Sequence, residues 1–241
     1  MNGNEKVQSM WMGPSLSPME QMCIRSYLKN GHAFHLYVYE PVENVPEGTT
    51  VMDANTILPR NEVYVDVFGG YISLSNQFRY ALLYRKGGWW VDMDTVCLKP
   101  FDFGADYVFS SETDETNNRI LVNTTFVKSL AGSRFLGDCL DFIRARGSRN
   151  IHWGELGVNL ISRMIFRNRL EQYIMPPASF CPISYQRLEL LMGSPPDYSL
   201  TDRSYALHWW NEVWRRRSLD KHGRFPQDCL YEKMKNRYLH N

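Results

Sequence analysis

A helix, a glycine stop, a short strand and two acids follow one another between residues 78 and 94. This succession constrains the fold more than any other part of the 241-residue chain. Apolar residues recur along one face of the helix at Leu74, Phe78, Ala81 and Leu82. The two glycines after Lys86 tolerate a left-handed exit, so the helix is predicted to end at Gly87 or Gly88.

The residues after the glycines form an apolar, aromatic run, Trp89-Trp90-Val91, which is typical of a buried strand. Alternate residues of an extended chain point the same way, so the next acids, Asp92 and Asp94, can converge on one point. Two converging carboxylates need a cation or a proton. Ligands of open α/β sheets bind outside the carboxyl ends of the strands, so we expect a binding site here.

The other face of the same helix carries Asn76, Arg79 and Leu83, so its polar side chains can take part in ligand binding. Ser73 or Ser75 can accept hydrogen bonds from the first free amides, so one of them is expected to cap the helix.

The first forty residues predict a β-α-β unit. A strand over residues 7–12 ends near Trp11, a capping box at Ser17 and Glu20 begins a helix at Pro18, and a second strand covers residues 34–39. Such units are right-handed and bring their strands together in parallel, which favours a nucleotide-binding α/β fold. By itself Trp11 is better explained as a core tryptophan than as a binding residue.

Later segments predict further scaffold. We expect a strand or hairpin arm over residues 63–68, a strand over 107–110 that Glu112 ends, and a strand over 120–127 that carries Asn123. A helix over residues 135–143 should be capped by Ser133.

The composition describes one ordered globular domain. Hydrophobic residues make up 44% of the chain and aromatic residues 14%, the net charge is +1, and no apolar stretch reaches the length of a membrane span. The five cysteines are scattered and lack a C-x-x-C pair, so neither disulfides nor zinc are indicated. We therefore expect a cytoplasmic protein that binds no nucleic acid.

The motif around the two acids resembles a known family. Ser75-Asn76, Phe78-Arg79-Tyr80, Leu83-Tyr84, Gly87-Gly88, Trp90 and Asp92-Met93-Asp94 together resemble the glycosyltransferases whose sugar-binding region contains a DXD motif. This family includes bacterial capsule and lipopolysaccharide enzymes and mannosyltransferases, with glucosylating toxins as more distant relatives. Trp11-Met12-Gly13, Trp153-Gly154-Glu155-Leu156-Gly157 and His208-Trp209-Trp210-Asn211 also resemble its elements.

The resemblance implies a GT-A-like, Rossmann-type nucleotide-sugar-binding fold with a mixed, mostly parallel central sheet flanked by helices. It implies one domain over residues 1–241, with a nucleotide-binding half to about residue 128 and an acceptor half beyond. It further implies metal-dependent transfer, with retention of configuration, from a nucleotide diphosphate sugar to a glycan or lipid-linked saccharide. A UDP-sugar is favoured as the donor over a GDP-sugar.

The resemblance also implies roles for single residues. Asp92, Asp94 and Arg79 would be catalytic, and Asp94, Asp92 and His208 would hold Mn²⁺ or Mg²⁺. Donor and nucleotide would contact Trp11, Tyr39, Asn76, Arg79, Asp92, Asn123 and Asn211. From the residue alone, His208 is better explained as a structural histidine than as a metal ligand.

Two departures from the family pattern leave alternatives open. Asn76 stands where the family has an aspartate, and Val158 where it has a proline. A neutral amide at position 76 is also compatible with a catalytically weak protein that binds sugar nucleotides. Asp92-Met93-Asp94-Thr95-Val96 also matches the opening motif of haloacid-dehalogenase-like phosphatases, with Asp92 as nucleophile. Against that reading, the motif does not follow the first strand.

The C-terminal segment, residues 211–241, is basic, with eight Lys and Arg against four acids. It is either a solvated helical surface or a surface that attracts anionic lipid heads, which would place the protein peripherally at the inner membrane face.

Overall fold

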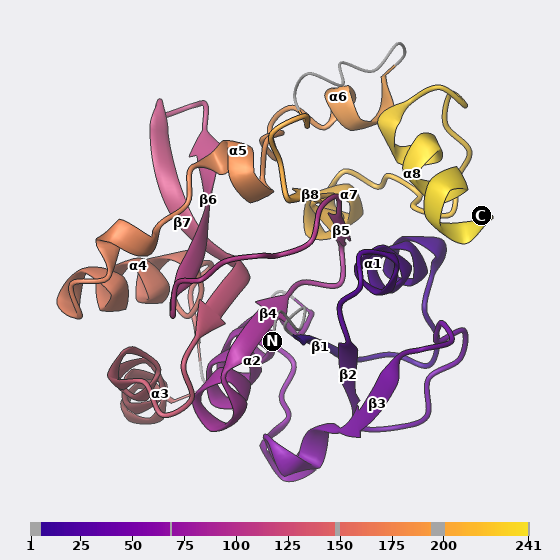
Figure 1. Cartoon of the computed structure of the whole chain (residues 1–241). Helices are drawn as coiled ribbons and strands as arrows, with labels where there is room; N and C mark the ends of the chain where they lie inside the picture. The colour runs from indigo at the N-terminus through magenta and orange to yellow at the C-terminus, as the bar shows by residue number, and fades with distance from the viewer. Residues whose placement is uncertain (1–5, 68, 148–149, 194–200, 241) are drawn as a thin grey trace.

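The computed structural model describes residues 6–67, 69–147, 150–193 and 201–240. Its centre is a six-stranded sheet in the order β3-β2-β1-β4-β7-β6 (Figure 1). The strands are β1 (Val7–Trp11), β2 (Phe34–Val38), β3 (Thr50–Asp53), β4 (Gly88–Val91), β6 (Val108–Asp114) and β7 (Arg119–Ser129). The first four run parallel, while β7 pairs antiparallel with β4 and β6 antiparallel with β7. The predicted mixed, mostly parallel α/β sheet is confirmed.

Helices cover both faces of this sheet (Figure 1). One core packs under α1 (Pro18–Lys29), α5 (Pro177–Phe180), α6 (Glu189–Met192), α7 (Asn211–Arg216) and α8 (Leu230–Leu239). The other packs under α2 (Ile72–Lys86), α3 (Arg134–Arg146) and α4 (Val158–Arg167). The first core takes residues from Val7 to Tyr238, so both ends of the chain build it. The division into two halves near residue 128 stays a prediction.

Helix α2 ends where the sequence predicts, but it begins differently. Gly87 and Gly88 have φ of 61° and 85°, which other residues rarely adopt, and they turn the chain directly into β4. Neither predicted serine caps the helix, because Tyr71 is the N-cap and makes no side-chain cap bond. The face expected to be open is also buried, since α2 packs against α3 as well as against the sheet, including β7.

Strand β4 is buried on both faces. Trp89 and Val91 contribute to one core and Trp90 to the other, as the alternation of side chains along a strand requires. Burial of each such side chain contributes about 1.5–3 kcal/mol. The strand that leads directly to the two acids is therefore among the most firmly held parts of the sheet.

Other predicted elements differ in extent. Residues 63–67 form no strand, and Phe68 lies outside the described residues. Glu112 does not end its strand, because β6 continues to Asp114 and pairs with β7 as far as Arg119. Ser133 is the N-cap of α3 by position, but its side chain makes no capping bond. The structure also contains three short 3₁₀ turns, η1 (Ala54–Thr56), η2 (Arg60–Glu62) and η3 (Glu171–Tyr173).

A separate two-stranded ribbon joins distant parts of the chain. Strand β5 (Thr95–Cys97) follows the two acids and pairs antiparallel with β8 (Ala206–His208). Thr95 lies opposite His208 in this pairing. The ribbon thus carries a residue from late in the sequence to the carboxyl end of β4. None of the described helices is both long and apolar enough to cross a bilayer.

Candidate active site

Asp92 follows β4 directly and is held by a buried cation. Its Oδ1 lies 3.0 Å from Nη2 of Arg79 and accepts a 2.7 Å hydrogen bond from Nε1 of Trp90. Arg79 also donates to Ser75 Oγ and to the carbonyl of Thr124, and its guanidinium lies 4.8 Å from the centre of the Trp90 ring. Burial raises the pKa of Asp92, and the charge of Arg79 opposes this rise.

Asp94 is held from the opposite side by the C-terminal segment. Its Oδ2 lies 3.1 Å from Nε2 of His208 and accepts a 2.7 Å hydrogen bond from the backbone amide of Asn211. Burial would raise the pKa of Asp94, but His208 and this amide keep it below its usual value. Burial would lower the pKa of His208, but Asp94 raises it well above the usual value.

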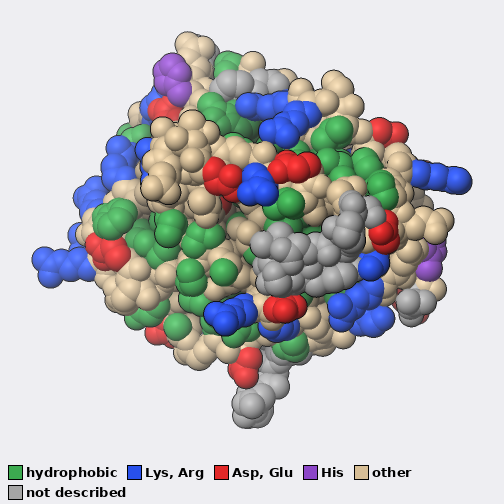
Figure 2. Space-filling model, turned by 90° about the horizontal axis from the view of Figure 1, so that it is seen from above, with side chains coloured by type: hydrophobic (Ala, Val, Ile, Leu, Met, Phe, Trp, Pro, Cys, Tyr) green, Lys and Arg blue, Asp and Glu red, His purple; other side chains and the backbone are tan. Residues whose placement is uncertain are grey.

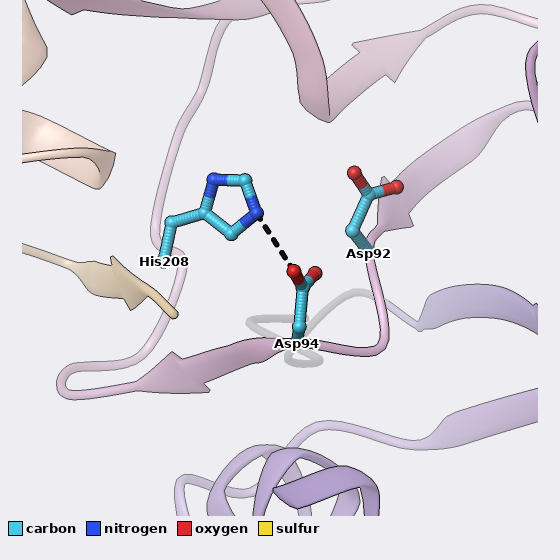
Figure 3. A group of neighbouring side chains, drawn as sticks. All are labelled: Asp92, Asp94 and His208. Carbon is cyan, nitrogen blue, oxygen red and sulfur yellow. Dashed lines mark hydrogen bonds and ion pairs between the residues drawn. The ribbon is translucent and has the colours of Figure 1, made fainter. Parts of the chain in front are cut away.

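Asp92, Asp94 and His208 point toward one common space (Figure 3). One ligand atom from each lies within 4.8 Å of the others, and the described residues contain no other such group of His, Cys, Asp or Glu. Two carboxylates and one imidazole suit a hard divalent cation such as Mg²⁺ or Mn²⁺. The donor set therefore fits the predicted metal.

The residues predicted to bind the nucleotide lie along the same sheet edge. Trp11 ends β1 and Tyr39 follows β2, and both strands run parallel to β4. Trp11 is partly exposed and donates from Nε1 to the carbonyl of Ser15, while the Tyr39 hydroxyl donates to the carbonyl of Leu58. Trp11 is therefore not a fully buried core residue.

Asn76 lies in α2, one turn before Arg79, and is 5% exposed. Its Nδ2 donates to the carbonyl of Ile72, while its Oδ1 is buried and has no partner among the described residues. The α-carbon of Gly157 faces it closely, since an added Cβ there would lie 3.2 Å from Asn76 Nδ2. The Trp153–Gly157 element thus packs against the helix that bears Arg79, and Val158 begins α4.

Two predicted residues meet the site differently from expectation. Asn211 reaches Asp94 through its backbone amide. Asn123 uses its side chain within the protein: Oδ1 accepts from Ser110 Oγ and from the amide of Thr125, and Nδ2 donates to Glu112 and Cys181. No polar group of Asn123 is left for a sugar in this arrangement.

Three residues near the site were not singled out from the sequence. Thr125 Oγ1 lies 3.5 Å from Nδ1 of His208, Cys181 contacts Asn123, and Glu112 accepts the 2.9 Å bond from Asn123 Nδ2. The sequence feature that could have identified Glu112 and Thr125 is the presence of polar residues at alternate positions of two otherwise apolar strands. These are Ser110, Glu112 and Asp114 in β6, and Asn123 and Thr125 in β7.

Solved structures of glycosyltransferases share this fold. The PaToxG glycosyltransferase superposes with a TM-score of 0.51 over 98% of this chain and 84% of its own, at 12% identity. The galactosyltransferase LgtC, solved with donor and acceptor sugar analogues, gives 0.51 over 97% and 96%, at 9% identity. At such identities the likeness concerns the fold.

Sequence comparison reaches the same group. A human α-1,4-N-acetylglucosaminyltransferase is 23% identical over 83% of this chain and 58% of its own length. A mouse lactosylceramide 4-α-galactosyltransferase is 28% identical over 58% and 41%. The chain thus matches about half the length of these relatives. Residues 34–118 match the family model of the glycosyltransferase sugar-binding region containing DXD motif. Residues 34–118 therefore resemble the DXD-containing sugar-binding region of the glycosyltransferases, within a chain that has a GT-A fold.

Proposed function

We propose that this protein is a metal-dependent glycosyltransferase that uses a nucleotide diphosphate sugar, with a UDP-sugar favoured as the donor. The observation that carries the proposal is the cluster of Asp92, Asp94 and His208 at the carboxyl end of β4 in a GT-A fold. These ligands come from two segments more than a hundred residues apart, which the β5–β8 pairing brings together.

Asp94, His208 and Asp92 would hold Mn²⁺ or Mg²⁺. When bound, the cation would supply positive charge against the departing diphosphate. Arg79 holds Asp92 by a direct ion pair, and its charge opposes the rise in the pKa of Asp92 that burial causes. The Asn211 amide does the same for Asp94 by donating a hydrogen bond to it. The orientation of both carboxylates is thus fixed by contacts within the protein.

The nucleotide would lie along the edge made by β2, β1 and β4, with its base against Trp11 and near Tyr39. A flat aromatic side chain at a strand end suits stacking on a base. The sugar would lie beyond the acids, toward Asn76 and the β6–β7 pair. Retention of configuration is proposed from the family resemblance.

The test is a thermal-shift screen with UDP-, GDP- and CMP-sugars, with and without manganese, followed by mass spectrometry of released sugar. A ligand that binds the native state raises its apparent stability. We expect a manganese-dependent shift with a UDP-sugar and slow release of the free sugar. A complete lack of shift with every donor would contradict the proposal.

Replacement of the proposed metal ligand sharpens this test. Asp94→Asn should abolish the manganese-dependent shift and lower turnover by at least about a hundredfold, because one ligand and its charge are lost. Asp141→Asn is the control, since Asp141 is exposed and forms a surface ion pair with Arg144. Normal turnover in the Asp94 variant would remove Asp94 from the metal site.

A second candidate, binding without efficient transfer, is favoured by one observation. Asn76 places an amide where the family has a carboxylate, and its Oδ1 is buried without a partner among the described residues. Asn76→Asp would then raise sugar transfer or hydrolysis above the wild-type rate. Robust turnover by the wild-type protein would exclude this candidate.

The acceptor is proposed to be a saccharide, free or lipid-linked, and the protein to work in the cytoplasm at the inner membrane face. Five free, buried thiols support a reducing compartment. The basic C-terminal segment supports membrane contact less strongly, because Arg215, Arg216, Lys221 and Lys235 already form ion pairs with acids. On the face seen in Figure 2, acidic and basic side chains are intermixed with apolar patches.

A further inference from the structure

The second half of β6 and the first half of β7, which lie next to the turn that joins them, form an arm. This arm extends beyond the end of β4 (Figure 1). Strand β4 pairs with β7 only from Val91 opposite Phe126 to Gly88 opposite Ser129. The first half of β7 therefore continues past the acids, paired with β6 from Ser111 to Asp114. Alternate side chains of this arm point to one face and form a surface, called the wall below, next to the cluster of Asp92, Asp94 and His208.

Glu112 is the buried acid of this wall. It is 8% exposed, and its Oε2 accepts the hydrogen bond from Asn123. Oε1 has no hydrogen-bond partner among the described residues and is not one of the fully buried unpartnered atoms, so it keeps contact with solvent. One carboxylate oxygen is therefore fixed by the protein, and the other remains available to a ligand.

A chain of side-chain contacts along the wall links Glu112 to His208 of the cluster. Asn123 contacts both Glu112 and Cys181, and the amide of Thr125 donates to Asn123 while its hydroxyl approaches His208. The charge of His208 acts on the pKa of Glu112, which burial raises. Glu112 therefore lies on the same side of the sheet as the cluster.

A purely structural role does not account for a carboxylate at this position. Burying an ionised acid costs several kcal/mol, and none of the described cations forms an ion pair with Glu112. A neutral acceptor would satisfy Asn123 equally well. A buried acid that lacks an ion-pair partner and lies close to proposed metal ligands is a candidate for ligand binding.

We propose that Glu112 binds hydroxyl groups of the transferred sugar, and that Asn123 is the positioning residue that holds it there. This inference rests on the proposed function. A sugar joined to a diphosphate at the cluster would extend along the β6–β7 arm. A carboxylate oxygen accepts hydrogen bonds from hydroxyls more strongly than a neutral group does.

The experiment compares UDP with UDP-glucose, UDP-galactose and UDP-N-acetylglucosamine on the wild-type protein and on Glu112→Gln, with manganese present. Glutamine has the same shape and still offers an oxygen to Asn123, so the wall should fold as before. We expect UDP to bind both proteins within about twofold. The affinity and hydrolysis rate of the accepted UDP-sugar should fall about ten- to a hundredfold in the variant, as expected for loss of a hydrogen bond to a charged group.

Glu115→Gln is the matched control, because Glu115 is an exposed glutamate at the tip of the same arm. It should leave UDP and UDP-sugar binding unchanged. Glu112→Asp keeps the negative charge on a side chain that is shorter by one methylene group. Its affinity for the UDP-sugar should therefore lie between those of Glu112→Gln and the wild-type protein. Wild-type affinity for the UDP-sugar in Glu112→Gln would overturn this inference alone. Failure of the wild-type protein to bind UDP with manganese would overturn the proposed function and this inference together.

Discussion

Each acid of the motif has its own counter-charge, and the two counter-charges come from different parts of the chain. Asp92 is paired with Arg79 from α2, while Asp94 is paired with His208 from β8. These pairs oppose the repulsion between two close carboxylates in a partly dry site. At the scale of single residues, the protein therefore holds a metal-ready geometry by internal ion pairs.

The Asp94–His208 pair predicts a pH-dependent stability. The pKa of His208 is raised on folding, so its contribution is fully present below about pH 6.5 and is lost as the pH rises through the folded value. The pKa of Asp94 is lowered, so its contribution appears above about pH 4 and is lost on acidification. His208→Gln should therefore lower the free energy of unfolding most at mildly acidic pH and least in alkali.

Denaturant unfolding in EDTA between about pH 5 and about pH 10 measures this difference. His35→Gln is the control with the opposite sign, because burial lowers the pKa of the half-buried His35 and favours its neutral form. A constant difference between wild type and His208→Gln across this range would contradict the ion pair.

At the scale of elements, the turn from α2 into β4 decides where the acids point. Gly87 combines a positive φ with close packing, since an added Cβ would lie 2.8 Å from the backbone nitrogen of Ala131. Backbone atoms cannot move aside cheaply. The helix and the strand are thus joined at a fixed angle by a residue without a side chain.

Gly87→Ala should lower the free energy of unfolding by about 2–4 kcal/mol, from backbone strain of about 1–2 kcal/mol plus the steric conflict. Gly132→Ala measures the backbone strain alone, because Gly132 has a similar φ of 68° and nothing lies within 4 Å of an added Cβ. Denaturant unfolding of both variants measures the difference. Equal losses in the two would mean that the close approach to Ala131 costs nothing.

At the scale of the whole molecule, the C-terminal helix closes the fold against its N-terminal part. Helix α8 packs against α1, and Lys221 pairs with Glu20 at 2.6 Å. Tyr238 is 3% exposed and donates a 2.9 Å hydrogen bond to the carbonyl of Cys97, at the end of β5. The ribbon that carries His208 is thereby supported from both ends of the chain.

Tyr238→Ala should lower the free energy of unfolding by about 3–5 kcal/mol, because a buried aromatic ring and its hydrogen bond are removed. Tyr84→Ala, at a position 39% exposed, should cost less than about half as much. Chemical denaturation of both variants provides the comparison. Equal stability of the two would argue that α8 is only loosely attached.

Local patterns in the sequence were sufficient to predict α1, α2, β4 and the placing of Asp92 and Asp94 after a buried strand. Capping boxes, glycine stops and apolar periodicity act between near neighbours, so they are readable without the fold. The sugar-binding region and its GT-A fold were implied by the resemblance of the motif to a known family. The strand expected over residues 63–68 is absent from its described part, because alternation alone does not supply a pairing partner.

The tertiary structure alone decided which distant groups meet. The pairing of β5 with β8 brings His208 to Asp94, and the length of the β6–β7 arm turns Glu112 and Asn123 toward the cluster. The burial of Asn76 against Gly157 is likewise a result of packing. Such contacts join residues dozens to more than a hundred positions apart or depend on strand register, and neither is encoded in any short segment.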